Sequence, residues 1–386
     1  MLRFLTAGES HGPGLVTIVE GLPRGLEFSA NDLSAELSRR RLGYGRGGRM
    51  KVERDEVEVI GGIRHGRTLG SPVAVVVRNS EAEKWSRPMS IEPVDDPVAR
   101  VTRPRPGHAD LAGMIKYGTD DARDVLERAS ARETAARTVA GFLAKAMLSQ
   151  VGVEVRSHVV SIGSVTARGK WNGLEDFAGI DDDPVRCLDK SASQEMVRLI
   201  DDVTERKDTL GGTFEVLAFD VPIGLGSYVH YDRRLDGALA GAIMSIPAIK
   251  GVEIGDGFEV ASAPGSLAHD EIVRKGGAKG RATNRAGGLE GGVSNGETLR
   301  VRAAMKPIST LMRPLQTIDM DSGEDAVAVR ERSDVCAVPA AAVVGEQMVA
   351  WVLAAETVVK FGGDTIEELA GSVSAHRKRV DDRLDR

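Results

Sequence analysis

The chain has 386 residues, 41% of them hydrophobic and 28% charged, which is typical of a globular protein with room for two ordinary domains or one large one. Its formal net charge of −6 argues against a protein that coats nucleic acid or a membrane surface. With two widely separated cysteines, no signal-peptide pattern and no run of about 18 apolar residues, we expect a cytoplasmic protein without disulfides, zinc or a membrane span.

Short runs rich in β-branched residues and bounded by glycine predict most of the strands. In chain order they cover residues 15–20, 57–60, 73–77, 153–162, 213–219, 251–254 and 299–305. Aromatic residues make up only 4% of the chain, so the core between these strands must be built from Val, Ile, Leu and Ala.

Three stretches predict helices. Residues 29–41 open with Ser29 three positions before Asp32, which resembles a capping box. Residues 120–150 form a long Ala-rich stretch, and residues 338–363 begin with a proline at the second position and end in glycines. The two long stretches are apolar over most of their circumference, so we expect both helices to be buried in a central layer covered by sheets.

A faint internal repeat relates GGIRHGRTL at residues 61–69 to GGVSNGETL at residues 291–299. Each copy follows a helix candidate that begins near an Asp, Asp32 in the first case and Asp236 in the second, and at least one short strand, and each is followed by a strand and later by one of the two long helices. We therefore predict one α+β domain over residues 1–386, with similar halves at about 1–160 and 210–363 that share a core. The Asp- and Gly-rich stretch 166–195 is expected to be a surface excursion, and residues 364–386 a C-terminal tail.

The N-terminal GESHG, residues 8–12, fits the G-x-S-x-G pattern of a hydrolase nucleophile elbow. An elbow needs a strand before the serine and a helix after it. Ser10 lies too early for a preceding sheet, and the residues that follow it read as a strand. We interpret the motif as a glycine-permitted turn that displays His11, and keep a serine hydrolase as the alternative.

Two further loops carry chemistry. Residues 39–51, RRRLGYGRGGRMK, contain a G-x-G-x-x-G spacing but follow a helix and lead to a strand, which excludes a dinucleotide fold. Their arginines form either a loop that closes on anions or a solvated basic face. In TRPRPGHADLAG, residues 102–113, a rigid loop carries His108 and Asp110, either as a catalytic edge or with Asp110 as a simple helix cap.

The glycine-rich stretch 276–296 lacks a nucleotide-triphosphate loop and is expected to be a mobile, basic segment over a ligand. It is followed by MKPIST at 305–310 and by RSDVCAVP at 332–339, where Asp334 precedes the second long helix. The remaining five histidines have no partner at metal-ligand spacing, so we expect no metal site.

Eight ordered segments together resemble the successive motifs of the chorismate synthase family: GESHG, RRRLGYGRGGRM, RPGHAD, ERASARETAARTVAG, IKGVEIGDGF, TNRAGGLEGG, KPIST and RSDVCAVPA. The resemblance implies a carbon–oxygen lyase of the shikimate pathway, which leads to the aromatic amino acids. Its reaction is the 1,4-anti elimination of phosphate from 5-enolpyruvylshikimate 3-phosphate, giving chorismate, with reduced FMN required and no net redox change. It also implies a homotetramer of β-α-β sandwich subunits, with helices between antiparallel sheets.

The resemblance further implies roles for single residues. His11 would be an acid toward the departing phosphate, His108 would stabilise the reduced flavin, and Asp334 would relay a proton at flavin N5. Arg40 and Arg46 match basic positions linked to NADPH or substrate anions. The positions that match flavin contacts are Arg128, Ala129, Ser130, Pro247, Ala248, Gly291, Lys306, Pro307, Ile308, Ser309, Thr310 and Arg332.

Two of these positions depart from the family pattern and put local flavin hydrogen bonds in doubt. Ala129 stands where the family often has serine, and Pro247 stands where it usually has Asn or Gln. The sequence leaves open whether NADPH reduces the flavin on this protein or a separate flavin reductase does so. A non-catalytic binder of phosphorylated ligands that uses the arginine loops remains the third alternative.

Overall fold

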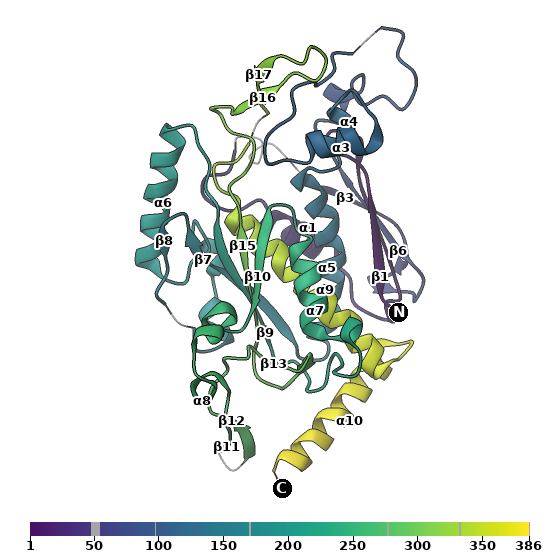
Figure 1. Cartoon of the computed structure of the whole chain (residues 1–386). Helices are drawn as coiled ribbons and strands as arrows, with labels where there is room; N and C mark the ends of the chain where they lie inside the picture. Colours follow the sequence, from purple (N-terminus) through teal and green to yellow (C-terminus); the bar gives the residue numbers. More distant parts are fainter. Residues whose placement is uncertain (48–54, 97, 170, 276–277, 332, 386) are drawn as a thin grey trace.

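A computed structural model describes residues 1–47, 55–96, 98–169, 171–275, 278–331 and 333–385. Two antiparallel sheets enclose a layer of helices (Figure 1). The first sheet has the spatial order β1 (Arg3–Ala7), β2 (Gly14–Glu20), β6 (Val73–Arg78) and β3 (Glu56–Gly61). The second runs β10 (Ile249–Ile254), β15 (Leu299–Met305), β9 (Gly212–Phe219), β7 (Glu154–Ile162) and β8 (Val165–Thr166).

All seven predicted strands are present, and the two sheets repeat one topology. Each sheet contains a unit of four strands, counted in chain order. The first strand of the unit is paired with the second, and the fourth strand lies between the second and the third. The series β1, β2, β3 and β6 thus corresponds to β7, β9, β10 and β15. The expected α+β fold of two similar halves is confirmed. The first half was expected to end at about residue 160, which lies within strand β7. The sheet topology makes β7 the first strand of the second unit.

The four helices between the sheets repeat as well. In each unit a short helix follows the second strand and a long helix follows the fourth: α1 (Ala30–Arg39) and α5 (Thr134–Ser149) in the first, α7 (Leu235–Met244) and α9 (Val338–Phe361) in the second. The helix α5 packs on β2, α9 packs on β7 and β9, and the two long helices pack on each other. Gly141 permits this close approach, because a Cβ there would collide with Gln347.

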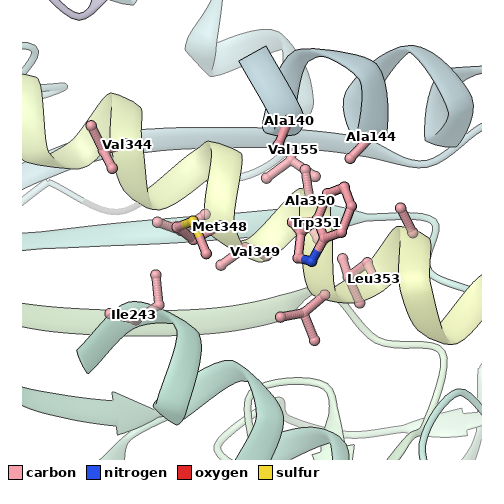
Figure 2. Packing of buried hydrophobic residues seen from close by; sticks show 14 of the residues in the cluster. Ala140, Ala144, Val155, Ile243, Val344, Met348, Val349, Ala350, Trp351 and Leu353 are labelled. Atoms are coloured by element: carbon pink, nitrogen blue, oxygen red, sulfur yellow. The ribbon is translucent and has the colours of Figure 1, made fainter. Parts of the chain in front are cut away.

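The buried position of the helix α9 explains why its sequence has no polar face. By length and composition it would be able to cross a membrane, yet 89% of its most apolar window is buried inside the protein. Val344, Met348 and Trp351 of α9 pack with Ala140 of α5 and Ile243 of α7 (Figure 2). A helix surrounded by other elements on all sides needs apolar residues on all sides.

We expected the stretch 120–150 to form one long helix, but it is divided into shorter elements. It contains α4 (Arg123–Leu126), a 3-10 turn (Ala131–Glu133) and α5, which begins at Thr134. Ser130 is extended, with φ −64° and ψ 144°, and its hydroxyl accepts from the backbone N–H of Arg132 in place of a helical bond. Arg128 and Arg132, which one continuous helix would place on the same face, therefore do not share a helix face.

The other helices lie at the surface. The expected tail is the helix α10 (Ile366–Leu384), which begins with a capping box between Thr365 and Glu368. The helix α3 (Asp110–Tyr117) lies beside α4, and α8 (Gly265–Ala268) is a single turn. The small hairpins are β4 (Ile63–Arg64) with β5 (Arg67–Thr68), β11 (Ile272–Lys275) with β12 (Ala278–Arg281), β13 (Leu289–Glu290) with β14 (Val293–Ser294), and β16 (Gln316–Ile318) with β17 (Asp325–Val327).

The excursion between β7 and β9 contains the helix α6 (Lys190–Glu205) and covers the outer face of the second sheet. Trp171 and Phe177 of this segment pack on Leu217 and Phe219 of β9. Part of the stretch that was expected to be a surface excursion is thus a third layer over the second sheet.

Candidate active site

A cavity of about 540 Å³ lies where the helical layer ends, at the first turns of α5 and α9. This volume falls in the range of roughly 300–1,000 Å³ found for ligand and cofactor sites. Thr134 of α5 and Ala340 of α9 form part of its wall. Because the N-terminal end of a helix carries a partial positive charge, two helix ends favour anions in this cavity.

His11 enters the cavity from the turn between β1 and β2. Gly8 has φ +101°, and a Cβ there would collide with the carbonyl oxygen of Gly14. The Asn79 side chain holds the turn, since its Nδ2 donates to the carbonyl oxygens of Glu9 (3.0 Å) and Gly12 (2.7 Å). The His11 ring lies 4.2 Å from the Trp85 ring, measured between centroids, in the 3-10 turn Ala82–Trp85.

The same turn lacks the geometry of a hydrolase elbow. Ser10 is 3% exposed and lies between two antiparallel strands, so neither an entering strand from a preceding sheet nor an exiting helix presents its hydroxyl. The nearest histidine, His11, places its Nδ1 2.7 Å from Oε2 of Glu127. The motif therefore presents an imidazole rather than an elbow serine.

His108 reaches the cavity from the loop before α3, paired with a buried carboxylate. Its Nδ1 lies 2.5 Å from Oδ1 of Asp110, and Arg105 donates to both oxygens of Asp110, at 2.8 and 3.1 Å. Burial raises the pKa of Asp110, yet the bonds from His108 and Arg105 outweigh it and hold that pKa well below its ordinary value. Asp110 makes no capping bond to α3, so it serves as the partner of His108 and Arg105.

Arg40 and Arg46 line the cavity, so these two arginines do not belong to a solvated basic face, whereas Arg49 and Lys51 of the same loop lie outside the described residues. Arg40 is 5% exposed and forms an ion pair with Asp55, which also pairs with Arg132. Burial raises the pKa of Asp55, and the charges of Arg40 and Arg132 lower it to a value below the ordinary one. Cavity-lining guanidinium groups held in place by buried acids are suited to bind phosphate and carboxylate groups.

The sequence comparisons agree with these features. A family model described as chorismate synthase matches residues 2–358. The chorismate synthase of Frankia casuarinae is 59% identical over 391 residues, covering 98% of this chain and 99% of its own length. That of Salinispora tropica is 59% identical over 388 residues, covering 97% and 99%.

The chain belongs to the chorismate synthase family.

A solved structure, "Crystal Structure of Chorismate Synthase", superposes with a TM-score of 0.78 at 40% identity and covers 100% of this chain and 98% of its own. The resemblance found in the eight segments thus extends over the whole fold. Chorismate synthases are carbon–oxygen lyases, and this chain is an enzyme of that class.

Asp334 is the third catalytic residue that the family motifs imply. It lies shortly before the first residue of α9 and lines the same cavity. Its Oδ1 accepts from the backbone N–H of Gly47 at 2.7 Å, and its Oδ2 lies 3.2 Å from Nη1 of Arg46. The arginine-rich loop and the start of α9 are therefore joined at this carboxylate.

Most of the flavin contacts predicted from the family motifs also line the cavity. Lys306 extends from the end of β15, donates to the carbonyl oxygen of Gly107 at 2.9 Å, and has a pKa lowered by burial and by the charge of Lys250. Thr310 accepts from Arg105 at 2.9 Å. The others in the wall are Ala129, Ser130, Pro247, Ala248, Ile308 and Ser309.

Three of the predicted contacts among the described residues do not line the cavity. Arg128 turns away from the cavity and donates to the carbonyl oxygens of Thr6 and Gly8 behind the turn that carries His11, and Pro307 is not in the wall. Gly291 lies between β13 and β14, eight residues before β15 begins, whereas Met305 at the other end of β15 lines the cavity. Within one chain Gly291 does not reach the cavity, and Arg332 lies outside the described residues.

Three side chains of the site escaped the sequence analysis: Glu127, Trp85 and Arg105. Glu127 pairs with His11 and Arg123. The available signals were the i, i+4 spacing of Arg123 and Glu127 on a predicted helix and the position of Arg105 three residues before His108.

Proposed function

We propose that this enzyme catalyses the 1,4-anti elimination of phosphate from 5-enolpyruvylshikimate 3-phosphate to give chorismate, with reduced FMN as cofactor. The observation that carries the proposal is one cavity into which two histidines project, each paired with a buried carboxylate, among Arg40, Arg46, Arg132 and Lys306. A hydrolase would need an exposed nucleophile here, and a simple anion binder would not need two oriented imidazoles.

In the elimination, the C3–O bond to phosphate and a C6–H bond break, and phosphate and a proton leave. The arginines bind the substrate phosphate and carboxylates, which orients the ring and stabilises the charge that develops on the departing phosphate. His11 donates a proton to that phosphate. Bound reduced FMN supplies the electron density and the hydrogen acceptor that cleavage of the unactivated C6–H bond requires.

The residues fit such a cofactor. Ala129, Ser130 and the segment Lys306–Thr310 would hold it, with backbone groups replacing the side-chain donors that Ala129 and Pro247 lack. His108 and Arg105 would stabilise the reduced form of the flavin, and Asp334 would relay the proton at flavin N5. Arg40 and Arg46 bind substrate anions or NADPH. The protein works in the cytoplasm as a homotetramer, in keeping with the buried position of α9 and an apolar outer face on the first sheet.

An anaerobic assay tests the proposal. The enzyme is mixed with 5-enolpyruvylshikimate 3-phosphate and chemically reduced FMN, and chorismate absorbance and phosphate release are followed together. We expect equal amounts of both products. Tight substrate binding without turnover would favour the non-catalytic binder and overturn the proposal. Replacing the chemical reductant by NADPH and oxidised FMN decides whether the chain reduces its own flavin or needs a separate flavin reductase.

A further inference from the structure

The side chains of His11, Glu127, Arg123 and Trp85 form a closed ring of contacts. His11 Nδ1 lies 2.7 Å from Oε2 of Glu127, whose Oε1 accepts from Nη1 of Arg123 at 2.9 Å. The Arg123 guanidinium lies over the Trp85 ring, 5.0 Å from its centroid, and Trp85 packs on His11. The ring joins the β1–β2 turn, the 3-10 turn Ala82–Trp85 and the segment from α4.

We infer that Glu127 is the positioning residue of His11: it holds Nδ1 as the protonated nitrogen and so makes Nε2 the atom that exchanges protons. The inference rests on the proposed catalytic role of His11. Oε2 of Glu127 also accepts from the backbone N–H of His11 at 3.2 Å, which fixes that oxygen as an acceptor toward this residue. An ionised carboxylate donates no hydrogen bond, so Nδ1 must be the donor.

The position of Glu127 supports this assignment. Its side chain is 1% exposed, and its carbonyl oxygen accepts from the backbone N–H of Ser10 at 3.0 Å, so backbone and side chain of one residue both hold the turn. Arg123 takes the second carboxylate oxygen and keeps it from rotating.

The second histidine of the cavity repeats the arrangement. His108 Nδ1 meets Asp110, and Arg105 holds that carboxylate as Arg123 holds Glu127. Both loops thus place Nδ1 of a histidine against a buried carboxylate that an arginine holds, although Arg105 bonds both oxygens of Asp110 and lies 3.0 Å from His108 Nδ1, whereas Arg123 bonds only Oε1 of Glu127. Orientation of an imidazole by a buried carboxylate is a recurring way to fix its tautomer.

Glu127→Gln, which keeps the length and removes the charge, is the test variant in the anaerobic assay. We expect kcat to fall roughly 10- to 100-fold with KM within about threefold, because proton transfer and not binding is affected. Added to His11→Ala, the same change should alter kcat by less than about threefold, since Glu127 acts through His11. The matched control is Glu133→Gln, a partly buried carboxylate six residues later that pairs with Arg137 and Thr6, and it should keep the wild-type kcat.

Long-range ¹H–¹⁵N correlation spectra of ring-labelled histidine provide a readout that needs neither flavin nor substrate. The His11 signals, identified by their loss in His11→Ala, should report the Nδ1–H tautomer in the wild type and a shift toward Nε2–H in Glu127→Gln. If Glu127→Gln does not fold, Glu127→Asp, which withdraws the carboxylate by one methylene, should change the tautomer and kcat in the same direction.

An unchanged tautomer together with a kcat within about twofold of wild type would overturn the inference, as would fully multiplicative effects in the double variant. If the wild type makes no chorismate, or His11→Ala keeps the wild-type rate, the proposed function or the role of His11 fails instead. The tautomer spectra then decide the role of Glu127 on their own.

Discussion

His11 and Ser10 are neighbours on one turn, but their surroundings differ. Both residues line the cavity, but the His11 ring pairs with a buried carboxylate, whereas the backbone N–H of Ser10 bonds to the Glu127 carbonyl oxygen and does not depend on the Ser10 side chain. We therefore predict that His11→Ala and His108→Ala each lower kcat by about 10²–10⁴-fold, while Ser10→Ala keeps most of the rate. Steady-state kinetics with reduced FMN measure this. Loss of activity in Ser10→Ala with both histidines dispensable would restore the hydrolase alternative.

Single site residues could be predicted from the sequence where a short local motif contains the residue that carries the chemistry. His11, His108 and Asp334 stand in short motifs, and all three line one cavity. Their partners are another matter, because Glu127 follows His11 by 116 residues, and only the docking of α4 against the β1–β2 turn brings the two together. Gly291 shows the converse, since a motif match does not reveal which end of a strand a residue occupies.

Strand β9 carries a buried carboxylate, Glu215, that ties the second sheet to the excursion above it. Glu215 accepts from Trp171 at 3.1 Å and lies between His158, Arg300 and Arg302. Burial raises its pKa, but His158 and the two arginines outweigh this and lower the pKa from 4.5 to about 2.

A group whose pKa is lowered on folding stabilises the protein above its unfolded pKa, and this contribution is lost as the pH falls through the folded value. We predict that Glu215 contributes up to roughly 3 kcal/mol at neutral pH, complete above pH about 4.5 and lost toward pH about 2. Urea unfolding of the wild type and Glu215→Gln across this range checks it. The difference between the two free energies of unfolding should narrow as the pH falls, and a constant difference would contradict the prediction.

The secondary-structure elements could be predicted where buried and exposed residues alternate along a strand, or where a helix is buried on all sides. The strands and α9 show these patterns, and each lies within a few residues of its expected bounds. The break before α5 was not predictable, because it depends on Ser130 capping the backbone and on Arg132 reaching Asp55 and Asn79. Arg186 was also missed: it lies in the Asp-rich excursion, yet it is fully buried and pairs with Glu346 of α9 at 2.9 Å.

The whole molecule is asymmetric despite its repeated topology. The excursion covers the outer face of the second sheet, but in the part of the chain that the structure describes no segment packs as a layer on the outer face of the first. There Leu5 (66% exposed) lies directly opposite Ile18 (42%), and Ile18 lies opposite Ala74. The pairs Arg3–Glu20 and Arg78–Glu58 lie on the same sheet. An apolar row between ion pairs on an antiparallel sheet is typical of a contact surface between subunits.

We therefore predict that this face is buried between subunits in the proposed homotetramer. Ile18→Glu, in a central strand, places a charge that would lose its hydration in the interface, so sedimentation velocity at micromolar concentration should show dimers or monomers in place of tetramers. Ile91→Glu is the matched control, because Ile91 is 92% exposed in a loop and belongs to no strand of the sheet, and this variant should assemble like the wild type. At that concentration the molar mass obtained for the wild type from sedimentation velocity should be four times the chain mass of 41.1 kDa. A monomeric wild type, or an intact tetramer of Ile18→Glu, would show that the first sheet faces solvent in the assembled enzyme.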